Sequence, residues 1–180
     1  MNNAFLVGKE MYLRPVELAD AQTIQNWHND PDIRSMARLG ELPVTFVHEE
    51  KDIEEAIARE EDIYLLIVTK STDKPVGFIR VNYIDRTSRN MWLRMIIGDK
   101  EATGKHLAED SLRCVLHWLF SEQNVHRVSL ETYGTNKRAI GFFKKLGFKQ
   151  EGVIREAVYV AGEYHDIIAF GLLSREFQQV

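Results

Sequence analysis

The hydrophobic pattern of the chain divides it into short segments with either strand-like or helical periodicity. Strands are predicted where apolar residues run continuously or alternate with polar ones, at residues 11–16, 63–69, 75–83, 90–97, 127–133, 153–160 and 164–173. Helices are predicted where apolar residues recur every three or four positions, at residues 18–29, 49–60, 106–120 and 136–146. The last two strands are expected to form a hairpin around Ala161 and Gly162.

This order of elements predicts an α/β (α+β) fold with a mixed sheet and helices on its faces. The run IYLLIVT (63–69) is apolar throughout, which is typical of a strand buried on both faces. The segment NMWLRMII (90–97) alternates, so one face of that strand is expected to carry Met91, Leu93, Met95 and Ile97. The strand, helix and strand between residues 90 and 133 predict a right-handed crossover that joins parallel strands.

Length and composition indicate one globular domain over residues 1–180, because the chain is long enough to bury a core. Hydrophobic residues make up 44% and charged residues 28%, which excludes a disordered chain. The 27 acidic and 23 basic residues give a net charge of -4. This balance argues against a nucleic-acid partner and mildly favours a cationic one.

The location that we expect is the cytoplasm. The single cysteine, Cys114, excludes an internal disulfide and is expected to be buried filler in a helix. The first residues, MNNAFLVGKEM, lack the charged and apolar regions of a signal peptide. No apolar run approaches the roughly 20 residues that span a bilayer, so no membrane partner is expected. The six histidines have no metal-ligand spacing, so no metal site is predicted.

The stretch NKRAIGFFKKLGF (136–148) predicts a short helix with a favourable capping residue at each end. Asn136 is a favourable N-cap, because its side-chain oxygen can accept a hydrogen bond from an amide of the first turn. Gly147 is a favourable residue after the last turn, since glycine enters the left-handed conformation without penalty. In such an ending Phe143 and Phe148 are expected to touch.

The loop IIGDKEATGKHLAEDSL (96–112) joins a strand to a helix N-terminus, where free amides and the helix dipole can bind a phosphate. Gly104 allows close backbone approach and Lys105 adds a positive charge. Taken alone, the loop is better explained as a plain connector. A Walker loop is excluded because His106 follows Lys105, and a GxGxxG fingerprint is absent.

Taken together, the 96–112 loop and the 136–148 helix resemble the GNAT superfamily of acyl-CoA-dependent N-acetyltransferases. The order of elements matches that family from about residue 11 to residue 173, and the hairpin VYVAGEYHDIIAFGLL and the early NWHNDPDIRSM resemble its Rim-type branch. That branch acetylates ribosomal-protein N-termini, spermidine and some amino sugars. The resemblance implies a mostly antiparallel sheet with a splayed central strand pair, and acetyl-CoA as cosubstrate.

The resemblance also implies which residues contact CoA. The family loop [QR]xxGx[GA] binds the pyrophosphate through backbone amides. Thr103 stands at its Gln or Arg position, Gly104 and Lys105 match the common GK, His106 replaces a glycine, and Ala108 occupies the Gly/Ala position after Leu107. The pantetheine arm is implied to lie along the strand and helix residues Met95, Ile96, Ile97, Asn136, Ala139 and Phe143.

Two positions depart from the family's usual catalytic pair, so the catalytic residues stay unassigned. Trp92 stands where many relatives have a glutamate that removes the amine proton, and Phe143 where many have a tyrosine that protonates the thiolate. Glu131, Tyr159 and His165 are weak alternatives that are more simply surface or structural residues. Trp92 is explained either by core packing, the simpler reading, or by an acceptor pocket in which a cation lies over its ring.

The predicted function is transfer of an acetyl group from acetyl-CoA to a primary amine by direct attack in a ternary complex. The acceptor is a small-molecule amine such as a polyamine or amino sugar, or a peptide N-terminus. The alternative is a non-catalytic module that binds an acyl-CoA or a partner on the same fold. Acidic residues crowd positions 49–62, which favours either a polyamine site or, more simply, a solvated helix face. Many relatives dimerise, so the resemblance allows a homodimer.

Overall fold

The computed structural model describes residues 3–37, 42–59, 61–102 and 106–178. The strands are β1 (Leu6–Val7), β2 (Met11–Pro15), β3 (Asp62–Thr69), β4 (Pro75–Asp85), β5 (Asn90–Ile97), β6 (Arg127–Tyr133), β7 (Lys149–Val160) and β8 (Glu163–Leu173). The α-helices are α1 (Ala21–Asn29), α2 (Pro31–Met36), α3 (Phe46–Ala58), α4 (Leu107–Ser121) and α5 (Lys137–Lys145). Short 3-10 turns occupy Leu18–Asp20, Lys100–Ala102 and Ser174–Glu176.

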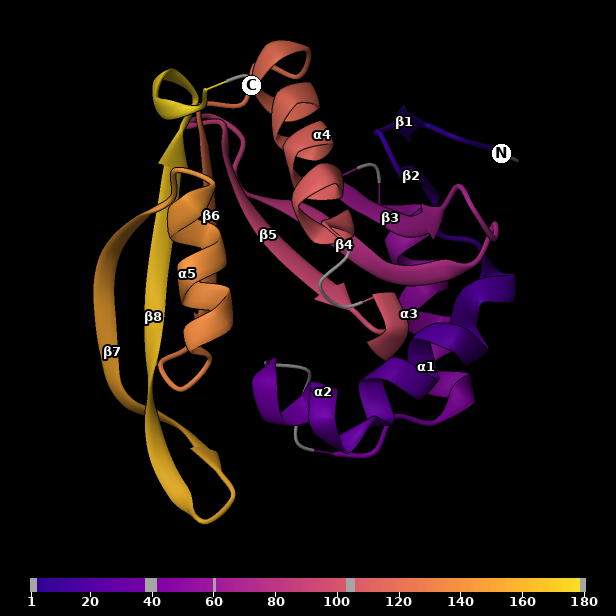
Figure 1. Ribbon diagram of the computed structural model, residues 1–180, viewed down its shortest axis with the longest axis horizontal. Coiled ribbons are helices and arrows are strands. Elements are labelled where there is room, and N and C mark those ends of the chain that lie inside the picture. The colour runs from indigo at the N-terminus through magenta and orange to yellow at the C-terminus, as the bar shows by residue number, and fades with distance from the viewer. Residues whose placement is uncertain (1–2, 38–41, 60, 103–105, 179–180) are drawn as a thin grey trace.

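All described strands join one sheet of order β1-β2-β3-β4-β5-β6-β8-β7 (Figure 1). Neighbouring strands are antiparallel at every junction except between β5 and β6, which are parallel. This confirms the mixed, mostly antiparallel sheet and the parallel pair on either side of α4. The last hairpin turns at Ala161 and Gly162, which both have positive φ angles, as two-residue hairpin turns require.

The parallel junction between β5 and β6 is short. Its register contains three pairs, from Asn90 opposite Arg127 to Trp92 opposite Ser129. Beyond Trp92 the register pairs β5 with β4 alone, while β6 continues beside β8 as far as Tyr133. The two strands therefore diverge, and the predicted splay of the central pair is confirmed.

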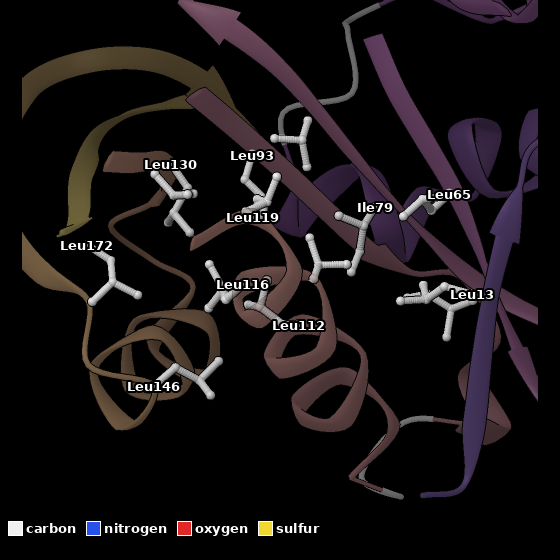
Figure 2. Close-up of a cluster of buried hydrophobic side chains, with 14 of the residues drawn as sticks. Leu13, Leu65, Ile79, Leu93, Leu112, Leu116, Leu119, Leu130, Leu146 and Leu172 are labelled. Carbon is white, nitrogen blue, oxygen red and sulfur yellow. The ribbon is translucent and has the colours of Figure 1, made fainter. Parts of the chain in front are cut away.

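The sheet has a buried apolar layer on each face. One layer packs α4 against alternate strand residues, and Figure 2 shows Leu112, Leu116 and Leu119 of α4 lying among leucines of the strands. The other layer packs Ile24 of α1 and Ile53 of α3 against the opposite face. Because β3 is covered on both sides, its continuous apolar sequence follows from its position, as predicted.

The N-terminal helices differ from the predicted ones. The segment expected as one helix over 18–29 begins with a 3-10 turn, and α2 follows it although no helix was predicted there. The signal for α2 is local: the Asp30 side chain accepts hydrogen bonds from the amides of Asp32 and Ile33, and Pro31 occupies the first turn. Its six residues are too few for the periodicity test that found the longer helices. No described helix has the length and apolarity needed to cross a bilayer.

Arg80 of β4 ties α3 to the sheet beneath it. Its guanidinium donates hydrogen bonds to both carboxylate oxygens of Asp62 on β3, at 2.6–3.1 Å, and to Asp52 on α3 at 2.6 Å. The Asp62 side chain is 3% exposed, so its charge depends on this partner. Burial lowers the pKa of Arg80, but the hydrogen bonds to Asp62 and Asp52 outweigh it and the net pKa is raised.

We predict that Arg80→Leu destabilises the protein by roughly 3–5 kcal/mol, because it leaves the Asp62 carboxylate buried without a cation. Urea denaturation measures the change. Arg86→Leu is the matched control, since Arg86 pairs with Glu61 while both side chains are more than half exposed. That change is expected to cost at most about 1 kcal/mol. Equal losses in the two variants would contradict a special role for the buried network.

Candidate active site

The N-terminus of α5 is fixed by Asn136, and the same side chain reaches across to α2. Its Oδ1 accepts a hydrogen bond from the Ala139 amide at 3.0 Å, which confirms the predicted cap. Its Nδ2 donates a hydrogen bond to the carbonyl oxygen of Met36 at 3.0 Å. Figure 1 shows α2 and α5 approaching one another below the diverging ends of β5 and β6. Asn136 therefore links the N-terminus of α5 to the C-terminus of α2.

The C-terminus of α5 has the predicted glycine ending. Gly147 has φ 95°, its amide bonds the Lys144 carbonyl at 3.1 Å, and the Phe148 amide bonds the Phe143 carbonyl at 3.0 Å. The Phe143 and Phe148 rings touch, with centroids 5.8 Å apart. The half-buried Phe143 ring also lies 6.0 Å from the ring of Phe170. Phe143 thus closes the core under α5, and its ring carries no proton for transfer.

The loop before α4 is described from His106 onward, and the predicted pyrophosphate contacts Thr103, Gly104 and Lys105 lie outside the described residues. His106 is exposed and adopts the left-handed conformation, with φ 58° and ψ 0°. Such a backbone favours glycine, the residue that the family has at this position. Leu107 is buried and Ala108 is partly buried in the first turn of α4.

An ion pair links the first turn of α4 to the end of α5. Glu109 bonds Lys145 at 2.6 Å and Arg113, one turn further along α4, at 3.2 Å. The hydrogen bond from Lys145 is the main cause that lowers the pKa of Glu109, and Arg113 lowers it further. The two cations offset a carboxylate that would otherwise repel an anion near this helix N-terminus.

The C-terminal half of β5 places its side chains on alternate faces of the sheet. Met95 and Ile97 pack against the layer under α4, as the alternation predicted, and Ile96 packs against the layer under α1 and α3. Just beyond the strand, Gly98 lies against the Trp27 ring of α1, where a Cβ atom would come within 2.2 Å of that ring. The C-terminal half of β5 is therefore packed on both faces of the sheet.

Trp92 and Glu131 share one face of the sheet. Trp92 lies opposite Ser129, and Glu131 follows Ser129 by two positions along β6, so alternation puts the three side chains on the same side. Arg94 is two residues beyond Trp92 on that face and is exposed. Trp92 is partly buried and belongs to neither apolar layer formed by the described residues, so its predicted core packing is not seen. Both candidates lie on the face that carries α1 and α3.

On this same face a pocket of about 170 Å³ opens between α1, α3 and strands β3 to β5. It is lined by His28, Val44, His48, Glu49, Asp52, Tyr64, Phe78, Arg80 and Arg94. The rings of Tyr64 and Phe78 meet edge to face at 5.3 Å, and the Arg80 guanidinium lies 4.9 Å from the centre of the Tyr64 ring. Burial, and next the charge of Glu49, raise the pKa of Tyr64, so its phenol stays protonated. The sequence offered the acidic run at 49–62 as one reading of an acceptor site, and two of its members line this pocket. The other lining residues were not found from the sequence, because they come from separate elements.

Most carboxylates of the acidic run at 49–62 contact a basic side chain. Glu49 pairs with His28, Asp52 and Asp62 with Arg80, Glu55 with Lys51 and Arg59, and Glu61 with Arg86. Glu60 lies outside the described residues. The run is thus mostly a paired surface, as a solvated helix face would be, and only part of it reaches the pocket.

Tyr159 and His165 belong to the outer part of the β7–β8 hairpin. Tyr159 is 55% exposed and its ring stacks with that of Tyr164 at 5.0 Å. His165 pairs with Val158 in the same hairpin and is partly buried. Figure 1 shows this end of the hairpin projecting beyond the rest of the sheet. Neither residue lines the pocket described above.

Comparison with known proteins agrees with this geometry. The model of the acetyltransferase (GNAT) domain family matches residues 10–149. The N-acetyltransferase p20 of Bacillus licheniformis is 25% identical over 96% of this chain and 97% of its own length. The spermidine N(1)-acetyltransferase of Vibrio cholerae is 24% identical over 95% of this chain and 97% of its own. A crystal structure of the Vibrio cholerae spermidine N-acetyltransferase in complex with CoA and spermine superimposes with a TM-score of 0.83 and 22% identity, over 93% of this chain and 97% of that one.

The diverging strands and the helix-capped gap define a GNAT fold, and the chain belongs to the GNAT family of acetyltransferases. Its curated relatives place it among acetyl-CoA-dependent N-acetyltransferases, which confirms the resemblance drawn from the sequence.

We predict that His106→Gly stabilises the protein by up to about 1 kcal/mol, since glycine removes the cost of a left-handed backbone at a residue with a Cβ atom. Acetyl-CoA is expected to bind this variant more tightly, because the backbone can approach the pyrophosphate more closely. Urea denaturation and calorimetric titration measure the two effects. His106→Ala is the control, because it removes the imidazole but keeps the Cβ. Weaker binding to His106→Gly would show that the imidazole itself contributes to affinity.

We predict that Lys145→Met raises the pKa of Glu109 toward its ordinary value. A carboxylate with a lowered pKa in the folded state adds stability above its unfolded pKa, about 4.3. That stability disappears as the pH falls through the lowered value. The variant should therefore be less stable than the native protein at pH 7, and the difference should shrink as the pH falls below about 4.3, by urea denaturation. Lys144→Met, one residue away, removes an exposed lysine as the control, and an equal effect there would contradict the prediction.

Proposed function

We propose that the protein transfers the acetyl group of acetyl-CoA to a primary amine, with the cosubstrate lying in the gap between β5 and β6. The thioester is placed against the backbone of Met95 to Ile97, and the pantetheine arm runs beside Asn136, Ala139 and Phe143. The pyrophosphate binds the amides of the 103–108 loop. The observation that carries this proposal is the divergence of β5 from β6 after three residue pairs.

The divergence matters because a strand edge without a partner strand presents amides and carbonyls that need hydrogen bonds. From Leu93 to Ile97 the described register pairs β5 on its β4 side alone. A pantetheine arm, which contains two amide groups, can bind to that edge as an added strand would. An amide of the same edge can then polarise the thioester carbonyl.

The transfer proceeds by direct attack in a ternary complex. The lone pair of the neutral amine forms a bond to the carbonyl carbon, the carbon–sulfur bond breaks, and its electron pair leaves on the CoA sulfur. A substrate that arrives as an ammonium ion loses one proton before the attack. The second proton leaves the nitrogen as the amide forms, and the thiolate takes up a proton from solvent to become free CoA.

The phenylalanine at position 143 lowers the rate of this reaction without preventing it. A thiol with a pKa near the cysteine value of about 8.5 gives a thiolate that leaves without a general acid. A general acid typically contributes about 10²–10⁴-fold. Holding the amine against the thioester supplies roughly 7–11 kcal/mol of the barrier. Positioning is therefore the larger contribution, and it does not require a hydroxyl on α5.

The acceptor belongs to the primary amines that related enzymes acetylate. The Vibrio cholerae relative is named for spermidine, which supports a small-molecule amine. A peptide N-terminus or an amino sugar presents the same attacking group. A homodimer and a cytoplasmic location fit this function and belong to the same proposal. The competing view, a module that binds acyl-CoA without turning it over, is favoured by the aromatic residues at positions 92 and 143.

We predict micromolar binding of acetyl-CoA by calorimetry, and release of free CoA when an acceptor amine is added. The amines to test are spermidine, a short peptide with a free N-terminus, glucosamine and n-propylamine, with a colorimetric thiol assay. The fully N-acetylated form of each amine is the control, because an amide nitrogen does not attack the thioester. Binding without release for every amine would contradict the proposed acceptor class and favour the non-catalytic module. Absence of binding would contradict the CoA site.

A further inference from the structure

Glu49 is a buried carboxylate with one unsatisfied oxygen. Its side chain is 2% exposed, and its Oε2 lies 2.7 Å from Nδ1 of His28. Its Oε1 is buried and has no hydrogen-bond partner among the described residues. An unmade hydrogen bond at a buried polar atom destabilises the folded protein, and more so when the group is charged. Such an atom in a native structure calls for an explanation, and an absent ligand is one.

The surroundings of Glu49 form a site for a cation. Glu49 lines the pocket between α1, α3 and the sheet, whose floor is made by the rings of Tyr64 and Phe78. The His28 ring meets the Phe78 ring edge to face at 5.6 Å. Phe78 therefore helps to position the histidine that contacts the Glu49 carboxylate. A carboxylate oxygen and aromatic rings that line the same pocket can satisfy both the charge and the hydrogen bonds of an ammonium group.

The pocket also lies beside the strand that holds the thioester in the proposed function. Arg94, which lines the pocket, directly precedes Met95 on β5. Phe78 on the pocket floor pairs with Ile96 across the β4–β5 ladder. A small molecule whose nitrogen is bound in this pocket is therefore next to the part of β5 where the acetyl group is expected. The inference that follows rests on the proposed function.

We propose that Glu49 receives the ammonium group of the acceptor amine, and that His28 is the positioning residue that fixes the carboxylate. Glu49 Oε1 accepts a hydrogen bond from the ammonium and takes one of its protons. The nitrogen is left with a lone pair for attack on the thioester carbon. Glu49 thus supplies, from α3, the proton acceptor that Trp92 cannot supply from β5.

The other charges of the pocket are balanced. Arg80 bonds both Asp52 and Asp62, and Arg94 is the second cation of the lining. The buried Oε1 of Glu49 has no hydrogen-bond partner among the described residues, so the reacting ammonium group is expected there. A polyamine, a peptide N-terminus and an amino sugar each present such a group.

A purely structural role for the pair would give different results. If the His28–Glu49 contact served only to join α1 to α3, its loss would lower stability and leave the binding of small amines unchanged. Kinetic and binding measurements on a folded variant separate these cases. Glu49→Gln keeps the size of the side chain and removes its charge. Glu54→Gln removes the same charge from an exposed position on the same helix and is the matched control.

The first measurement uses the best acceptor from the amine panel. Glu49→Gln is expected to raise KM for the amine at least tenfold and to lower kcat, while the Kd for acetyl-CoA changes less than twofold. Glu54→Gln should match the native enzyme in all three constants. His28→Asn should show an intermediate loss, since the carboxylate remains but is less firmly positioned. An unchanged KM and kcat in Glu49→Gln would overturn the proposal while leaving the acetyltransferase function standing.

A binding experiment tests the site without any turnover. The histidine ring signals of the protein–CoA complex are followed by NMR while n-propylamine, spermidine or n-propanol is added. We expect n-propylamine to shift the His28 signals in the native protein but not in Glu49→Gln, and n-propanol to have no effect. A shift of the His28 signals by n-propanol as large as that by n-propylamine would overturn the requirement for a charged nitrogen. No shift of His28 with any amine would overturn the site itself, whether or not the amine panel shows turnover.

Discussion

The structure depends on a parallel strand pair whose backbone pairing ends after a few residues. Strands β5 and β6 share three residue pairs, and from there each follows a different neighbour. A complete parallel ladder would satisfy every backbone group and leave no room between the strands. The short ladder keeps the sheet continuous while it exposes one backbone edge in its centre. The helices α2, α4 and α5 lie around the C-terminal half of β5 (Figure 1). There the register of the described strands gives β5 no partner on its β6 side.

Most of the fold was predictable because its signals are local or periodic. The long strands and helices follow from alternation and three-to-four spacing, and both ends of α5 follow from Asn136 and Gly147. Helix α2 was missed because six residues are too few to show periodicity, although Asp30 followed by Pro31 is a capping signal. The proposed CoA contacts stay predictions, which were drawn from short, contiguous stretches of the sequence.

The acceptor side could not be predicted, because its chemistry depends on which residues the fold brings together. Glu49 is one acid in a run of many, and nothing in its sequence neighbours separates it from Glu54. In the structure Glu49 is buried against His28, from a helix 21 positions earlier, whereas Glu54 faces solvent. The interpretation of the run as a solvated face thus holds for most of its members and fails for Glu49, which is buried in the pocket lining.

The Asn136 side chain makes two hydrogen bonds, and this limits which residues can replace it. Its oxygen caps α5, and its nitrogen bonds the Met36 carbonyl on the other side of the gap. Aspartate and serine are comparable helix caps, but aspartate has no donor, and serine is too short to hold both partners with separate atoms. Asparagine alone among the common capping residues meets both demands. A substitution of Asn136 that keeps the helix cap therefore still loses the hydrogen bond that joins α5 to α2.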